Sequence, residues 1–148
     1  MKIEKATEKD LPQILQLQHL AYRSEAALVN NYSIQPLTQT LKDLRQEYER
    51  STVLKAIEND RIVGSIRGYP QDKTLHIGKL MVHPHFRRQG IGSALLQAIE
   101  SLYPNNRYEL FTSSYSVNNI TMYAKHGYQE FQRKPYFNDI LFVYMEKS

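Results

Sequence analysis

The sequence predicts an α/β fold, with a mixed, mostly antiparallel, twisted sheet of about seven strands and four helices. Two observations carry this prediction. The hydrophobic period is that of helices up to residue 50 and changes to two, the period of strands, from Thr52 onward. A strand, a helix and a second strand then follow one another between residues 75 and 112, and a right-handed crossover of this kind makes the two strands parallel.

The first fifty residues are expected to form one strand and two helices. The alternating run Lys2–Ala6 predicts an opening strand. Thr7 has the side chain of a helix cap, and an apolar face continues from there to about Ala26. The turn-forming residues 30–36 predict a loop, and Thr38 is then expected to cap the second helix.

The middle of the chain predicts three antiparallel strands. Residues 53–57 and 62–66 alternate as strands and are joined at Asn59-Asp60, a pair that tolerates left-handed backbone. A turn over residues 70–73 leads into a third strand, 75–82. Gly78 in its middle predicts a bulge, because glycine inside a strand often marks one. A bulge here would splay this strand from its parallel neighbour and leave backbone groups free for a ligand.

The end of the chain predicts a strand, a short helix and a closing hairpin. Residues 108–112 form the strand that returns parallel to 75–82. Ser116 or Asn118 is expected to cap the short helix, which Gly127 ends. Strands 128–133 and 140–145 then close the sheet around a loop over residues 134–139.

The step from the third strand into its helix predicts an anion site. An amphipathic helix opens at Gly90 and Gly92 and stops at Pro104. Its first backbone N–H groups have no partner within the helix and lie at the positive end of the helix dipole. The glycines let a ligand approach the backbone, and Arg87 and Arg88 add forked donors suited to phosphate.

Two common nucleotide-binding loops fit this stretch poorly. No segment has the P-loop spacing of glycine, four residues and Gly-Lys-Ser/Thr. The dinucleotide pattern G-x-G-x-x-G begins at Gly90 and Gly92, but Leu95 occupies its third glycine position. That pattern also requires an acid at the end of a second strand, whereas Glu109 opens its strand.

The stretch resembles the acyl-CoA-binding core of the GCN5-related N-acetyltransferase (GNAT) family. The family signature Gln/Arg-x-x-Gly-x-Gly/Ala is met by Arg87, Gly90 and Gly92, after an apolar strand and a Val-His-Pro step. A second family motif, Asn-x-x-x-Tyr-x-x-x-Gly-Phe/Tyr, is met from Asn119 to Tyr128. The predicted order of elements also matches, so the resemblance implies one acyl-CoA N-acyltransferase-like domain over residues 1–148.

The resemblance implies an enzyme that transfers the acetyl group of acetyl-CoA directly to a primary amine, with coenzyme A as product. A backbone N–H of Met81 or Val82 would stabilise the oxyanion, and Tyr123 would protonate the leaving thiolate. The implied acetyl-CoA-binding residues are Leu80, Met81, Val82, Arg87, Arg88, Gln89, Gly90, Ile91, Gly92, Ser93, Asn119 and Tyr123.

The general base stays open at this point. Many relatives place a glutamate on the strand before the signature, but residues 75–79 contain no acid. His76 is the nearest titratable substitute, because an imidazole titrates near neutral pH. Glu25, Glu109 and water are the alternatives.

The acceptor is expected to be an amine of a small molecule or a peptide. The first two helices, the loop over 31–37 and the hairpin tip should build its pocket, with Tyr32, Gln35 and Tyr136 lining it and Glu25 or Asp139 holding a cationic amine. His83 and His85 lack a third ligand nearby, so no metal site is expected.

Composition favours a cytoplasmic protein. There is no cysteine, which fits a reducing compartment and excludes a thiol nucleophile. No apolar run approaches the ~20 residues of a membrane span, and no basic-then-apolar leader is visible. The net charge of +4 is too small and scattered to indicate nucleic acid. The rival hypotheses are a non-catalytic acyl-CoA-binding sensor of the same fold and a phosphate- or nucleic-acid-binding module. Family members are often dimers, so a homodimer is also expected.

Overall fold

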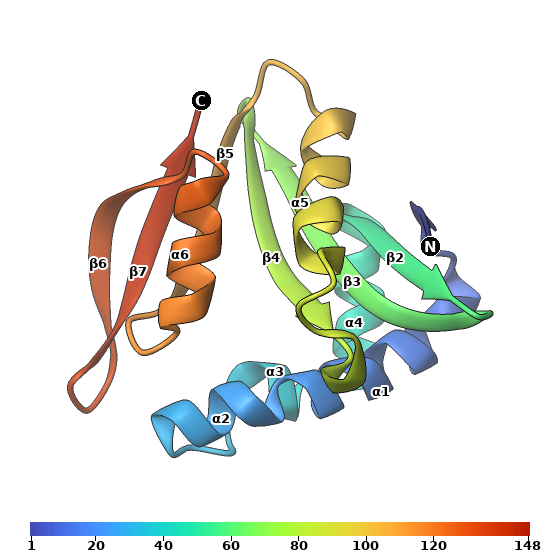
Figure 1. The fold of residues 1–148 in the computed structure, drawn as a ribbon, viewed down its shortest axis with the longest axis horizontal. Helices are drawn as coiled ribbons and strands as arrows, with labels where there is room; N and C mark the ends of the chain where they lie inside the picture. The colour runs from blue at the N-terminus through green and yellow to red at the C-terminus, as the bar shows by residue number, and fades with distance from the viewer.

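The computed structural model describes residues 1–148, whose seven strands form one sheet (Figure 1). The elements are β1 (Lys2–Lys5), η1 (Glu8–Asp10), α1 (Leu11–Ala21), α2 (Arg23–Val29), α3 (Gln35–Thr38), α4 (Leu41–Arg50), β2 (Thr52–Glu58), β3 (Arg61–Gln71), β4 (Thr74–Val82), η2 (Pro84–Phe86), α5 (Ile91–Leu102), β5 (Arg107–Ser113), α6 (Val117–Lys125), β6 (Gln129–Phe137) and β7 (Ile140–Lys147).

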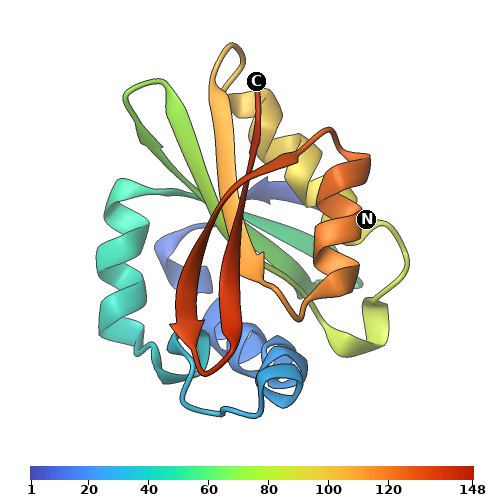
Figure 2. The same cartoon turned by 90° about the vertical axis from the view of Figure 1, so that its left-hand side faces the viewer.

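The strands lie in the order β1-β2-β3-β4-β5-β7-β6, and only β4 and β5 run parallel. The predicted mixed, mostly antiparallel α/β fold is therefore confirmed. Helices α5 and α6 cover one face of the sheet, whereas α4 lies on the other face and α1 to α3 lie below (Figures 1 and 2). None of the helices is both long and apolar enough to cross a membrane.

Two clusters of buried side chains hold these layers together. The larger one packs α5 against the sheet through residues such as Leu95, Leu96 and Ile99, all fully buried. The second packs α1 and α4 against the opposite face, where Leu11 and Leu44 are fully buried. Helices α1, α4 and α5 therefore bury their apolar stripes, which is the main source of stability for such short helices.

The sheet opens at its centre, as the bulge at Gly78 predicts. Along the ladder between β3 and β4, the pair Ser65↔Met81 is followed by the pair Arg67↔Gly78. Two residues of β4 between these pairs therefore face one residue of β3. The left-handed backbone that makes this bulge falls on Lys79 (φ 51°). Strands β4 and β5 pair only from Thr74↔Arg107 to His76↔Glu109, and beyond that point they diverge.

The N-terminal helices differ from the prediction. The first helix is interrupted at Tyr22, because the Ala21 carbonyl accepts hydrogen bonds from the Arg87 guanidinium (2.9 Å) and the Ser24 hydroxyl (3.2 Å). Thr38 does not cap the second long helix but ends the additional one-turn helix α3. Thr40 caps α4 instead.

The cap of α4 is a reciprocal pair of hydrogen bonds. The Asp43 backbone N–H donates to the Thr40 hydroxyl, and the Thr40 backbone N–H donates to the Asp43 carboxylate, both at 3.2 Å.

The closing hairpin is also longer than predicted. Residues 134–137, expected as loop, continue β6 to Phe137, and only Asn138-Asp139 forms the turn.

Candidate functional site

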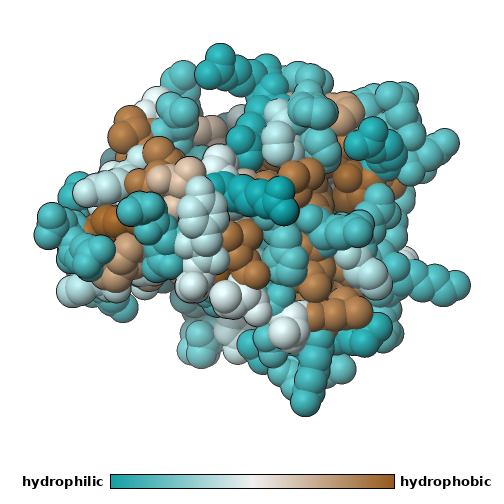
Figure 3. All heavy atoms as spheres, turned by 90° about the horizontal axis from the view of Figure 1, so that it is seen from below, coloured by the Kyte–Doolittle hydropathy of each residue, from teal (hydrophilic) through white to brown (hydrophobic).

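A cavity of about 1390 Å³ occupies the opening between β4 and β5. The junction of α1 and α2, strands β3 and β7, and helices α4 and α6 complete its walls. Seen from below, apolar side chains reach the surface among the hydrophilic ones on this side of the molecule (Figure 3). A mainly concave site with apolar walls and a few converging polar groups is the usual form of a small-molecule site.

One end of the cavity is the N-terminus of α5. Gly90 precedes this helix with φ 80°, a conformation that favours glycine. A Cβ atom at Gly90 would meet no other atom within 4 Å, and one at Gly92 would come no closer than 3.9 Å to Val82. The space above these residues is therefore open, and the unpartnered backbone N–H groups of the first turn face a site that suits an anion.

The residues around this helix start divide into three groups. Leu80, Met81, Val82, Arg87, Arg88, Gly92, Asn119 and Tyr123 line the cavity. Ile91 is buried in the core, and the Ser93 hydroxyl lies 2.9 Å from Nε2 of His126. These two and the exposed Gln89 can therefore meet a ligand at the helix start through their backbone N–H groups. Arg88 makes no ion pair within the chain and is exposed, while Arg87 is bound to Ala21 and Ser24.

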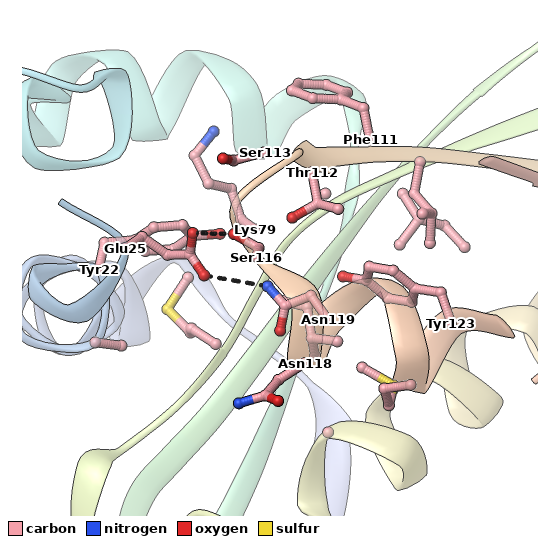
Figure 4. Close-up of a pocket in the computed structure, with 18 of the residues that line it drawn as sticks. Tyr22, Glu25, Lys79, Phe111, Thr112, Ser113, Ser116, Asn118, Asn119 and Tyr123 are labelled. Atoms are coloured by element: carbon pink, nitrogen blue, oxygen red, sulfur yellow. Dashed lines mark hydrogen bonds between the residues drawn. The ribbon is translucent and has the colours of Figure 1, made fainter. Parts of the chain in front are cut away.

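Tyr123 lies near the middle of the cavity. Figure 4 shows its hydroxyl pointing into the open space, on the side of Asn119 and Thr112. The ring is buried, and its centroid lies 6.0 Å from that of Tyr128. Burial, together with the nearby Glu25 carboxylate, raises the pKa of the Tyr123 phenol well above its usual value, so the hydroxyl keeps its proton.

Glu25 connects the lower helices to α6. Its carboxylate accepts hydrogen bonds from the Ser116 hydroxyl (2.5 Å) and the Asn119 amide (3.2 Å), as Figure 4 shows. Tyr22 lies beside these groups, and burial raises the pKa of its phenol as well. Glu25 therefore faces the same space as the Tyr123 hydroxyl.

A buried polar network behind β3 was not found by sequence reasoning. Arg67 is 2% exposed, and its guanidinium donates to Gln18, to Gln39 and to the Glu47 carboxylate (3.2 Å). Gln39 also donates to Glu47 at 2.7 Å. The charged residue Arg67 within the mostly apolar run of β3 is the one signal in the sequence that marks this network.

His76 occupies the closed end of the cavity, at the last parallel pair of β4 and β5. Its Nδ1 lies 3.5 Å from the Glu109 carboxylate, which also accepts from Arg107 at 2.8 Å. The two alternative bases His76 and Glu109 are thus neighbours of one another, while Glu25 lies at the open side with Tyr123.

The other predicted acceptor residues lie outside the cavity lining. Tyr32 is 60% exposed, and Gln35 is exposed on α3. Tyr136 stacks on Phe142 with ring centroids 4.0 Å apart, and Phe142 does line the cavity. His83 accepts a hydrogen bond from the His85 backbone N–H, and no group of three or more histidine, aspartate or glutamate residues is placed to hold a metal ion.

Residues 19–148 match the family model of the acetyltransferase (GNAT) domain. The chain belongs to the GNAT acetyltransferase family. UPF0157 protein YqkA from Bacillus subtilis (strain 168) is 29% identical over 119 residues, which are 80% of this chain and 34% of YqkA. The chain thus spans about a third of the length of that relative.

Solved structures of this family share the fold. The ribosomal-protein-S18-alanine N-acetyltransferase from Escherichia coli superposes with a TM-score of 0.82 at 16% identity, covering 98% of this chain and 91% of that one. PaiA N-acetyltransferase from Thermoplasma acidophilum, in complex with coenzyme A, gives 0.78 at 16% identity, with 97% and 98% covered. At these identities the likeness establishes the acyltransferase fold and leaves the acceptor of this GNAT protein open.

Proposed function

We propose that this GNAT protein is a cytoplasmic N-acetyltransferase that transfers the acetyl group of acetyl-CoA directly to a primary amine. The observation that carries the proposal is the unpaired edge of β4. From Ile77 onward this strand has no partner on its β5 side, and it faces a cavity that has an anion site at one end and the Tyr123 hydroxyl near its middle.

The residues present fit acetyl-CoA. The open space at Gly90 and Gly92, with the exposed Arg88 beside it, suits the pyrophosphate of the coenzyme. The backbone groups of Leu80, Met81 and Val82 that point away from β3 would bind the pantetheine arm as a further strand would. When bound, acetyl-CoA supplies a thioester whose carbonyl an amine can attack.

The chain itself supplies two of the three groups that the reaction needs. A backbone N–H of Met81 or Val82 donates to the oxygen that becomes negative when the amine attacks. The Tyr123 hydroxyl, which carries its proton at neutral pH, gives that proton to the sulfur of the departing coenzyme A. No covalent intermediate is needed, and no cysteine is present to form one.

Glu25 is the best-placed group for the acceptor amine. Its carboxylate shares the open side of the cavity with Tyr123, and Ser116 and Asn119 hold it in place. A carboxylate here attracts an ammonium group and receives, directly or through water, the proton that the amine must lose. His76 and Glu109 pair with each other at the closed end.

The test is a measurement of acetyl transfer by release of the coenzyme A thiol, to which the protein itself contributes no cysteine. The expected result is turnover with at least one primary amine, and a loss of about 10²–10⁴-fold in kcat for Tyr123→Phe in a variant that still binds acetyl-CoA. A sensor that only binds acyl-CoA would show no turnover and would bind equally well with either residue. That result would contradict the proposed chemistry.

A further inference from the structure

Lys79 is a charged residue of the cavity wall that the proposed transfer reaction does not use. It belongs to the bulge of β4, and its ammonium points toward α4 (Figure 4). No carboxylate lies within 4 Å of it, so it takes part in none of the ion pairs of the chain. The one acid whose charge acts on Lys79 is Glu47 on α4. That carboxylate already accepts hydrogen bonds from Arg67 and Gln39.

The backbone of Lys79 is unfavourable for a lysine. Its φ of 51° is left-handed, a conformation that glycine adopts without strain and lysine does not. The neighbouring Gly78 does not have this conformation, and a Cβ atom there would meet no other atom within 4 Å. A glycine at position 79 would form the same bulge at lower cost. Such strain is found at ligand-binding positions and also in tight turns, as at Lys73 in this chain.

The charges of this part of the cavity sum to one unit of positive charge. Arg67 and Lys79 are cations and Glu47 is an anion. Burial, together with the nearby Arg67 cation, lowers the pKa of Lys79, and the Glu47 carboxylate offsets this only in part. A monoanionic group bound here would neutralise the cluster. The Glu25 carboxylate, which lines the same cavity, is suited to a cation.

Aromatic rings form the remaining wall, on β5 and β7. Phe111 lies with its ring centroid 4.8 Å from that of Phe142 and 5.2 Å from that of Tyr144, and it is 50% exposed although all three line the cavity. A flat or apolar body would cover these rings and gain hydrophobic stabilisation.

From this arrangement we infer that the acceptor is a small amino acid, an amine that also carries a carboxylate, with an apolar or aromatic side chain. Lys79 binds the carboxylate, Glu25 receives the amine, and the rings of Phe111, Phe142 and Tyr144 contact the side chain. This inference rests on the proposed acetyl transfer and specifies its acceptor.

The test uses acceptors that differ only in the carboxylate. The pairs are L-phenylalanine with 2-phenylethylamine and L-leucine with 3-methylbutylamine, each kcat/KM being corrected for the fraction of neutral amine. A charge-assisted hydrogen bond predicts a preference of roughly 10- to 100-fold for the acid of each pair. Lys79→Met should abolish the preference by slowing the acid alone, and Lys79→Arg should retain most of it.

Three results would overturn the inference. The first is an equal kcat/KM for the amino acid and the amine of each pair. The second is a preference for the amino acid that survives in Lys79→Met. The third is that the protein binds acetyl-CoA but acetylates no amino acid. The last result leaves the proposed function standing with another acceptor. Failure to bind acetyl-CoA at all would remove both.

Lys79→Gly separates a ligand-binding role from a structural one. Glycine relieves the left-handed strain, so the melting temperature should be no lower than that of the wild type, while the preference for the acid is lost. A lysine that only stabilises the fold would instead show a lower melting temperature and an unchanged preference.

Discussion

Arg67 lies almost fully buried between β3 and the helices, in one network with Gln18, Gln39 and Glu47. Its importance follows from contacts that span 20 to 49 residues of sequence, which periodicity and spacing do not reveal. Gly90 and Tyr123 were predictable for the opposite reason. Each belongs to a short motif whose meaning is local.

Glu47→Ala should destabilise the protein strongly. The change leaves the Arg67 guanidinium buried without a counter-ion, and removing one partner of a buried pair costs about 3 kcal/mol. Urea unfolding measures the change. Glu49→Ala on the same helix is the control, because Glu49 is exposed and makes no ion pair, and it should alter the free energy of unfolding by less than about 0.5 kcal/mol. Equal effects for the two variants would contradict the role of the network.

The start of α5 shows at the scale of an element how local chemistry sets both structure and function. Gly90 takes the left-handed conformation, the helix follows directly, and its end before Pro104 is where the sequence predicts it. The break between α1 and α2 is different, since Arg87, 66 residues away, bonds to the Ala21 carbonyl. The apolar face runs on through this break, so the sequence pattern does not show it.

Gly92→Glu should separate ligand binding from stability. An acid in the first turn of α5 favours the helix dipole and leaves the melting temperature unchanged or slightly raised. The same charge repels an anionic ligand at the helix start, and acetyl-CoA affinity should fall at least about 100-fold. Calorimetric titration measures the affinity. Gln97→Glu, exposed further along α5, adds the same charge away from the site and should bind normally. Equal affinities for both variants would place the coenzyme elsewhere.

The sheet as a whole is the best-predicted feature of the molecule. The change of period at Thr52, the turn at Asn59-Asp60 and the crossover through α5 are each read from adjacent residues, and they predict the central strands and the one parallel pair. The bulge is predicted from Gly78, yet Lys79 carries the left-handed backbone. The cavity walls combine residues from nine elements, which explains why Lys79 and the aromatic wall emerge only from the fold.

Stability should fall at alkaline pH. Burial raises the phenolic pKa of Tyr22, Tyr123 and Tyr128 above the ordinary value of 10, so the folded state holds these protons more tightly than the unfolded chain does. Their contribution is complete below pH 10 and is lost as the pH rises above it. Melting curves between pH 8 and 11 should show this decline, and Tyr123→Phe should make it less steep. The same slope in both proteins would contradict the assignment.

The most direct test of acyl-CoA binding in the opening of the sheet is a comparison of melting temperatures without ligand and with acetyl-CoA, coenzyme A, NAD or ATP. Ligand at ~100 times its dissociation constant adds about 2.7 kcal/mol of stability. For a chain of this size that is a rise of roughly 5–10 °C. We expect the rise with acetyl-CoA and coenzyme A alone. No rise with either, or an equal rise with NAD or ATP, would contradict the acetyltransferase function proposed for this protein.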